Sequence, residues 1–216
     1  MTVQTFGLPK DWKDFLSSER NRAYAKKVIR RGVEPSIQHL LKYAGEIFGL
    51  SCGPDLLALR LFPNLKEISE SFGCFDAVRY RLQEYDLKDP DVNLVSVGDG
   101  CTPRTAATFA LRTAWKCYSI DPRLKGGTLR WSAVKNLIIV KDRVQNFYLE
   151  SEKVVVVCVH SHVSLSESIE GIRAKKLSVV AIPCCVSLRL RGEPDIQYEE
   201  AGIISPCRTV KIWKSV

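Results

Sequence analysis

The sequence has no apolar run that approaches the roughly 20 residues needed to cross a bilayer. Its beginning, Met1 to Asp14, lacks the basic-then-apolar layout of a secretory signal. Internal repeats and low-complexity linkers are also missing, which argues against solenoids and other repeat folds. These absences predict a soluble, intracellular protein, cytoplasmic or nuclear, with no membrane partner.

The eight cysteines include no Cys-x-x-Cys pair. They are Cys52, Cys74, Cys101, Cys117, Cys158, Cys184, Cys185 and Cys207. Several of them lie inside apolar runs, as buried thiols do. We therefore expect reduced cysteines of a cytosolic or nuclear protein rather than a disulfide framework.

The composition includes 45% hydrophobic residues, and the length of 216 residues suits one domain with or without an extension. The net charge of +8 favours a polyanionic partner, although ordinary solubility charge explains it as well. Basic residues are concentrated in the predicted helix Asp11–Arg31, which is either a phosphate-binding face or a solvated one. The concentrated residues are Arg20, Arg22, Lys26, Lys27, Arg30 and Arg31.

Residues 1–90 are predicted to form a helical N-terminal extension. After Asp11–Arg31, helical spacing predicts Ser36–Phe48, then Asp55–Leu61, then Asn64–Phe72 with a stop at Gly73. The segment Phe75–Gln83 fits a helix or a strand. The best domain boundary is Asp89-Pro90-Asp91, although these helices could instead pack directly on a sheet formed by the residues after that boundary.

Residues 91–216 alternate between β-branched runs and helical segments. Strands are predicted at 92–97, 115–120, 136–140, 154–159 and 177–182, with two more at 186–190 and 209–213. Helices are predicted at 103–114, with Thr102 as a candidate N-cap, and at 164–175, where Ser164 and Glu167 have capping-box spacing. This alternation predicts an α/β fold with a mostly parallel sheet and helices on both faces.

A glycine turn follows the first of these strands. Gly98 and Gly100 stand between Val97 and a helix start, and Asp121 ends the next strand about 20 residues later. Glycines let a backbone approach a ligand closely, and an acid at that spacing suits ribose hydroxyls. The pattern predicts a site for an adenosine-containing cofactor.

From Val92 to Val216 the sequence resembles the class I, Rossmann-like S-adenosylmethionine-dependent methyltransferases. The resemblance implies that Gly98, Asp99 and Gly100 hold the methionine part of S-adenosylmethionine. It also implies that Asp121 binds the ribose and that Asp142, after the third strand, contacts adenine. Ser96 stands where the family usually has an acid, and Thr102-Pro103 replace the third glycine. A nicotinamide-binding domain is the rival, but it needs that third glycine.

Histidines and cysteines follow the fourth and fifth strands, whose carboxyl ends should be neighbours. His160 and His162 are the candidate catalytic residues, as general base or substrate-orienting group. Two other interpretations are zinc binding together with Cys184 and Cys185, and simple packing. The spacing of these residues is not that of a recognised zinc finger, so no metal is expected. His160 and the Cys184-Cys185 pair are also similar to a subgroup that includes a tRNA 2′-O-methyltransferase.

These observations predict a methyltransferase that acts on RNA through a basic surface. The loop with Gly126-Gly127 could close on a ligand, and Trp131 is either a base-stacking or a core residue. The motifs of amino-methylating nucleic-acid enzymes and the Lys-Asp-Lys-Glu set are missing. The alternative is therefore a catalytically inactive, methyltransferase-like subunit that binds RNA or a protein partner.

Overall fold

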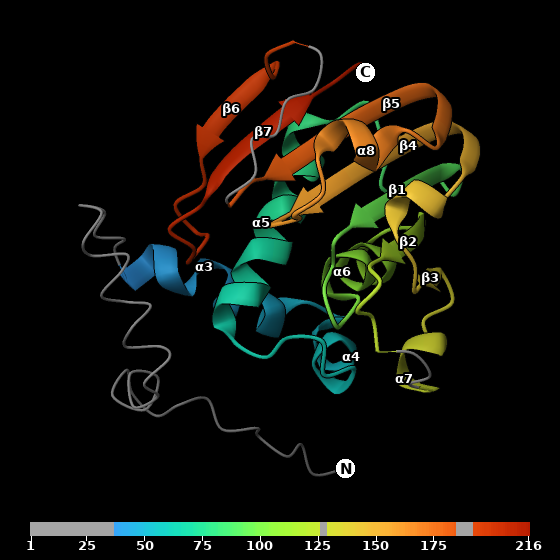
Figure 1. Cartoon of the computed structure of the whole chain (residues 1–216). Helices are drawn as coiled ribbons and strands as arrows, with labels where there is room; N and C mark the ends of the chain where they lie inside the picture. Colours follow the sequence, from blue (N-terminus) through green and yellow to red (C-terminus); the bar gives the residue numbers. More distant parts are fainter. Residues whose placement is uncertain (1–36, 126–128, 185–191) are drawn as a thin grey trace. The chain divides into compact units, whose positions relative to one another are not determined.

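The computed structural model describes residues 37–125, 129–184 and 192–216, within one compact unit, Ile37–Val216 (Figure 1). Four of the predicted features lie outside the described residues. These are the basic helix 11–31, the Gly126-Gly127 loop, Cys185 and the strand 186–190. In the described part, no helix is long and apolar enough to cross a membrane.

Seven strands of the described chain form one sheet in the order β3-β2-β1-β4-β5-β7-β6 (Figure 1). The strands are β1 (Val92–Val97), β2 (Lys116–Ile120), β3 (Leu137–Val140), β4 (Leu149–Val159), β5 (Ile172–Ile182), β6 (Ile196–Glu199) and β7 (Thr209–Trp213). β1 to β5 pair in parallel, whereas β7 is antiparallel to β5 and β6. The predicted Rossmann-like, mostly parallel sheet is thus confirmed.

The β-branched runs form the centre of this sheet because they can be covered on both faces. Leu94 of β1 packs with Val155 and Val157 of β4 on one face, and Val95 packs with Val156 on the other. The strand order reverses between β1 and β4, and in open α/β sheets ligands bind at the carboxyl ends beside such a reversal. This is where the predicted site residues lie.

Helices cover both faces, but unequally. The Leu94 face packs against α3 (Ile37–Gly49), α4 (Gly53–Ala58), α5 (Leu65–Arg81), α6 (Arg104–Arg112) and α7 (Leu129–Ser132). The other face carries the short α8 (Leu165–Ile169) and the 3-10 turn η1 (Val144–Asn146). Trp131 is 5% exposed, and its indole N–H donates to the Leu59 carbonyl oxygen, so it is a core residue rather than a base-stacking one.

The stop predicted at Gly73 was wrong, because α5 continues through it to Arg81. A Cβ at Gly73 would lie 2.6 Å from Ile203 Cγ1, so this glycine makes room for a neighbour and does not end the helix. Phe72, Phe75 and Val78 of α5 are buried in the same core as the sheet. The described helices before β1 therefore pack directly on the sheet.

The connection between β4 and β5 also differs from prediction. α8 ends at Ile169 and β5 begins at Ile172, so the expected helix to Lys175 was too long. Residues 172–176 alternate between inward and outward positions and pair with 149–153 of β4. The predicted capping box is present, with Ser164 accepting from the Glu167 N–H and Glu167 accepting from the Ser164 N–H.

Candidate functional site

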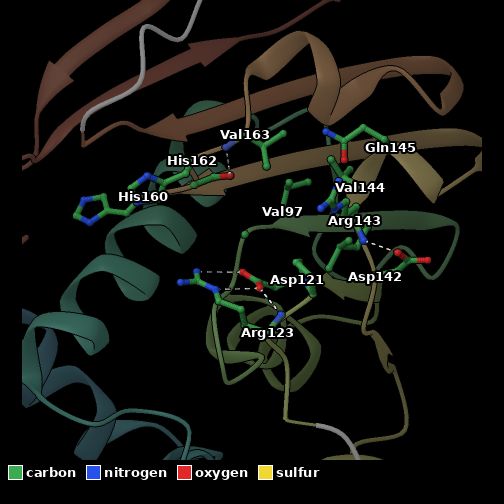
Figure 2. A pocket seen from close by; sticks show the side chains of 14 residues that line it. Val97, Asp121, Arg123, Asp142, Arg143, Val144, Gln145, His160, His162 and Val163 are labelled. Atoms are coloured by element: carbon green, nitrogen blue, oxygen red, sulfur yellow. Dashed lines mark hydrogen bonds and ion pairs between the residues drawn. The ribbon is translucent and has the colours of Figure 1, made fainter.

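A pocket of about 450 Å³ opens at the carboxyl ends of the central strands (Figure 2). This volume lies in the range of small-molecule and cofactor sites. Residues that follow β1, β2, β3 and β4 form its walls. The lining comprises Val97, Gly98, Ile120, Asp121, Pro122, Arg123, Asp142, Arg143, Val144, Gln145, His160, Ser161, His162 and Val163.

Gly98 of the glycine turn lines the pocket, whereas Gly100, also predicted to hold the cofactor, does not. Gly98 has φ +77° and Gly100 has φ +82°, which is the left-handed region that favours glycine. A Cβ at Gly98 would lie 2.6 Å from Ser161 Oγ and 2.9 Å from Ser161 Cβ. The turn after β1 therefore packs directly against the turn after β4.

Asp99 does not line the pocket, although the family resemblance placed it at the cofactor. It is 3% exposed, and its carboxylate accepts hydrogen bonds from the N–H groups of Thr105 and Ala106 and from Ser119 Oγ. It thus caps the start of α6. The expected N-cap, Thr102, instead donates its hydroxyl to the Leu61 carbonyl oxygen, and Pro103 holds the N-cap position without a side-chain bond.

Asp121 lies in the pocket wall at the end of β2, where the sequence placed it. Its carboxylate accepts short hydrogen bonds from the backbone N–H groups of Arg123 (2.7 Å) and Gly100 (2.9 Å). It also accepts longer ones from Arg123 Nε (3.3 Å) and Nη2 (3.4 Å), drawn in Figure 2. The backbone bonds orient the carboxylate, while the guanidinium, whose side chain is 69% exposed, covers its open side.

Asp142 follows β3 and lines the opposite wall. Its Oδ1 accepts from Asn146 Nδ2 at 2.9 Å. It also accepts from the Arg143 N–H at 2.7 Å, a bond drawn in Figure 2. These two bonds, with that of Asn146 the stronger cause, lower the pKa of this exposed carboxyl group below its usual value. Asp142 is therefore ionised and held in place at the pocket rim.

His160 lies at the end of β4, but its ring is held from two sides. Nε2 is 3.0 Å from the Cys207 carbonyl oxygen, and Nδ1 is 3.1 Å from Glu70 Oε1 of α5. Burial lowers the pKa of His160 to about 4. Both ring nitrogens are thus engaged with protein groups, an arrangement that positions a loop better than it accepts a proton from a substrate.

His162, the second candidate catalytic residue, is exposed and also lines the pocket. Cys184 and Cys207 lie near the His160 turn. The Cys184 thiol is 3.8 Å from the His160 carbonyl oxygen, and the Cys207 thiol is 3.4 Å from the Cys184 carbonyl oxygen. Within the described residues, no group of three or more His, Cys, Asp or Glu side chains is arranged to hold a metal. Among the cysteines described there, Cys74, Cys117 and Cys158 are buried thiols.

Sequence reasoning missed Glu70 and the charged residues around it. Glu70 is 1% exposed, and its Oε1 lies 2.6 Å from Lys66 Nζ. The adjacent Glu67 forms an ion pair with Arg104 of α6, 2.8 Å from Oε2 to Nη2. Nothing in the local pattern marks Glu70, because its partner His160 stands 90 positions further along the sequence.

No protein-family model and no curated protein matches this chain. Among solved structures, a mutant of MtNAS in complex with S-adenosylmethionine has a TM-score of 0.45 at 10% identity, over 94% of this chain and 82% of that one. A second structure is the 1,6-didemethyltoxoflavin-N1-methyltransferase of Burkholderia thailandensis with bound 1,6-didemethyltoxoflavin and S-adenosylhomocysteine. It has a TM-score of 0.38 at 12% identity, over 85% of this chain and 74% of that one. Neither likeness carries an argument about activity.

Proposed function

We propose that this protein is an S-adenosylmethionine-dependent methyltransferase. The observation that carries the proposal is the Asp121 carboxylate, oriented by two backbone N–H groups beside a left-handed glycine turn in a pocket of about 450 Å³. Paired ribose hydroxyls are donors that match such a carboxylate, and Gly98 brings the backbone of the turn to the pocket. When bound, the cofactor would supply an electrophilic methyl group on a sulfonium.

The Arg123 guanidinium lies where the ribose would bind, and it is displaceable. Its two hydrogen bonds to Asp121 are the longest of the four, and its side chain is 69% exposed, so it can turn toward solvent when other donors reach the carboxylate. Ribose hydroxyls would take over these two bonds, while the backbone bonds from Gly100 and Arg123 remain. Asp142, on the facing wall, is the candidate partner of the adenine amino group.

We further propose RNA as the substrate class. The net charge of +8 supports it, and the exposed Arg143 side chain lines the pocket, where it could contact a phosphate. His162, which is exposed and lines the same pocket, is the candidate group for orienting the methyl acceptor. The engagement of both His160 nitrogens favours a second candidate function, an inactive subunit that binds RNA or a protein partner.

The cofactor proposal is tested by calorimetric titration with S-adenosylhomocysteine, with NAD as the competing ligand class. We expect binding that Asp121→Ala weakens by about 10- to 100-fold, since bonds to a charged group are worth about 1.5–3 kcal/mol. Asp55→Ala is the control, because Asp55 is exposed and does not line the pocket. Equal affinity in the Asp121 and Asp55 variants would sink the assignment of the ribose site.

Catalysis and substrate class are tested together with labelled S-adenosylmethionine. Transfer of label to RNA, reduced by His162→Ala while S-adenosylhomocysteine affinity stays unchanged, would support the RNA methyltransferase. Cofactor binding without transfer to RNA, protein or small-molecule extracts would favour the inactive subunit instead.

A further inference from the structure

His160 adopts a backbone conformation that few non-glycine residues accept, with φ +52°. Such a conformation persists only where surrounding contacts determine it. Here the contacts are the two ring interactions, with Cys207 on one side and Glu70 on the other, and the backbone bond from the His160 N–H to the Ile182 carbonyl oxygen. The ring therefore links the end of β4 to α5 and to the loop before β7.

The partners of the ring define where its protons are. A carbonyl oxygen only accepts, so the contact with Cys207 places a proton on Nε2. In a neutral ring Nδ1 is then an acceptor, and it faces a Glu70 oxygen at 3.1 Å. Two acceptors at that distance repel each other unless a proton lies between them. A proton shared by Glu70 and His160 would remove this repulsion, and Lys66 Nζ, 2.6 Å from the same Glu70 oxygen, is the other group that contacts it.

The surroundings decide where that proton resides. Lys66 and Arg104 favour an ionised Glu70, while Glu67 and burial oppose it. Burial dominates and raises the pKa of Glu70 to about 7, while burial lowers that of His160 to about 4. Below about pH 7 the shared proton is therefore expected on Glu70, facing Nδ1 of a neutral imidazole. Cys184, whose thiol approaches the His160 carbonyl, and Cys207 complete the groups that face the pair.

The pair acts on the pocket through one residue. Ser161 follows His160 and lies against Gly98, where even a single added carbon would collide with its side chain. Its hydroxyl also accepts from the Val163 N–H. We propose that a proton shared by Glu70 and His160 holds the β4 turn against the glycine turn, which makes Glu70 a positioning residue of the cofactor pocket. The link to a cofactor rests on the proposed function; the shared proton does not.

Stability against pH tests the shared proton without any cofactor. From pH 4.5 to 6.5 the unfolded and folded pairs hold similar numbers of protons, about one each near pH 5.5, where the proton is on histidine when unfolded and on Glu70 when folded. The pair then contributes little net slope. In Glu70→Gln, His160 is the one titrating group of the pair. Its pKa is lower in the folded than in the unfolded protein, so stability rises with pH. In His160→Asn, Glu70 is the one titrating group, and its pKa is higher in the folded protein, so stability falls as pH rises. We expect the unfolding constant of each variant, relative to wild type, to change more than tenfold in opposite directions across this window.

Two controls make this result decisive. Glu152→Gln removes an exposed carboxylate paired with the exposed Lys175. Its unfolding constant relative to wild type should not change with pH across the same window. The Glu70→Gln, His160→Asn double variant should deviate from additivity at least fivefold in the unfolding constant, because the two side chains are in contact. Slopes of the same sign, flat ratios or additive effects would overturn the shared proton.

Hydrogen exchange tests the positioning role. Glu70→Leu has no donor for Nδ1, whereas Glu70→Gln keeps one. We expect Glu70→Leu to accelerate exchange of the Gly98 and Gly100 amides at least fivefold and to weaken S-adenosylhomocysteine binding equally. Glu70→Gln should stay within twofold of wild type at the same pH, and the Val95 amide in β1 should be unaffected in both.

The two proposals fail in different ways. Unchanged Gly98 and Gly100 exchange in Glu70→Leu would overturn the positioning role, whatever the cofactor does. If even the wild type fails to bind S-adenosylhomocysteine, the proposed function falls, while the exchange and unfolding results still decide the inference about Glu70.

Discussion

At the residue scale, the pocket depends on backbone conformations as much as on side-chain chemistry. Gly98 and His160 both have positive φ, and they lie on the two turns that meet at Ser161. The glycine accepts this conformation without strain, whereas the histidine needs its two ring contacts to hold it. Small changes at either residue should therefore alter the same wall of the pocket.

Gly98→Ala tests this dependence. We expect a loss of about 2 kcal/mol in the free energy of unfolding, because alanine resists the left-handed conformation and its Cβ would lie 2.6 Å from Ser161 Oγ. Urea unfolding measures it. The control is Gly45→Ala in α3, where nothing lies within 4 Å and helix propensity predicts a gain of about 0.5–1 kcal/mol. Equal effects at the two positions would refute the argument.

At the element scale, the start of α6 and the length of α5 decide how the site is built. Asp99 closes the first turn of α6 and so keeps the glycine turn attached to that helix. α5 runs past Gly73, and its first two turns carry Lys66, Glu67 and Glu70 to the His160 turn. α5 thus contacts the turn that carries His160 and Ser161 of the pocket.

Gly73→Ala probes the packing of α5. We expect a loss of about 1–3 kcal/mol in wild type, because the new Cβ would lie 2.6–2.7 Å from the buried Ile203 side chain. In an Ile203→Ala background the same change should stabilise, since the obstruction is gone and alanine favours the helix. A double-mutant cycle by urea unfolding measures the coupling; the same sign in both backgrounds would show that the contact does not limit this position.

At the scale of the whole molecule, one sheet gathers residues that are far apart in the sequence. The parallel order β3-β2-β1-β4-β5 brings the ends of β1, β2, β3 and β4 to one edge, and Asp121, Asp142 and His160 meet there. The basic residues of 11–31 lie outside the described chain, so their part in binding is a matter for experiment.

Neutralising Arg30 and Arg31 together tests the RNA prediction. If these residues contact phosphates, the double alanine variant should bind RNA more weakly, and the slope of log affinity against log salt should fall by about 1–2. Filter binding across a salt series measures both. Binding of S-adenosylhomocysteine should stay as in wild type, and an unchanged salt slope would remove this segment from the RNA surface.

The sequence by itself determined the sheet and the edge where the pocket lies. Continuous β-branched runs are stable only as strands covered on both faces, and parallel strands bring their carboxyl ends together, so β1, β2 and the place of Asp121 could be predicted. Local patterns also located the capping box at Ser164, because its bonds join residues three positions apart.

Only the tertiary structure decided which polar groups are engaged with one another. Asp99 caps a helix, Arg123 covers Asp121, and Glu70 meets His160. β6, within a polar connection, and the course of α5 through Gly73 likewise depend on contacts with distant segments. Sequence periodicity indicates which face of an element is buried. It does not indicate which distant side chain contacts that face, because this depends on how the elements pack.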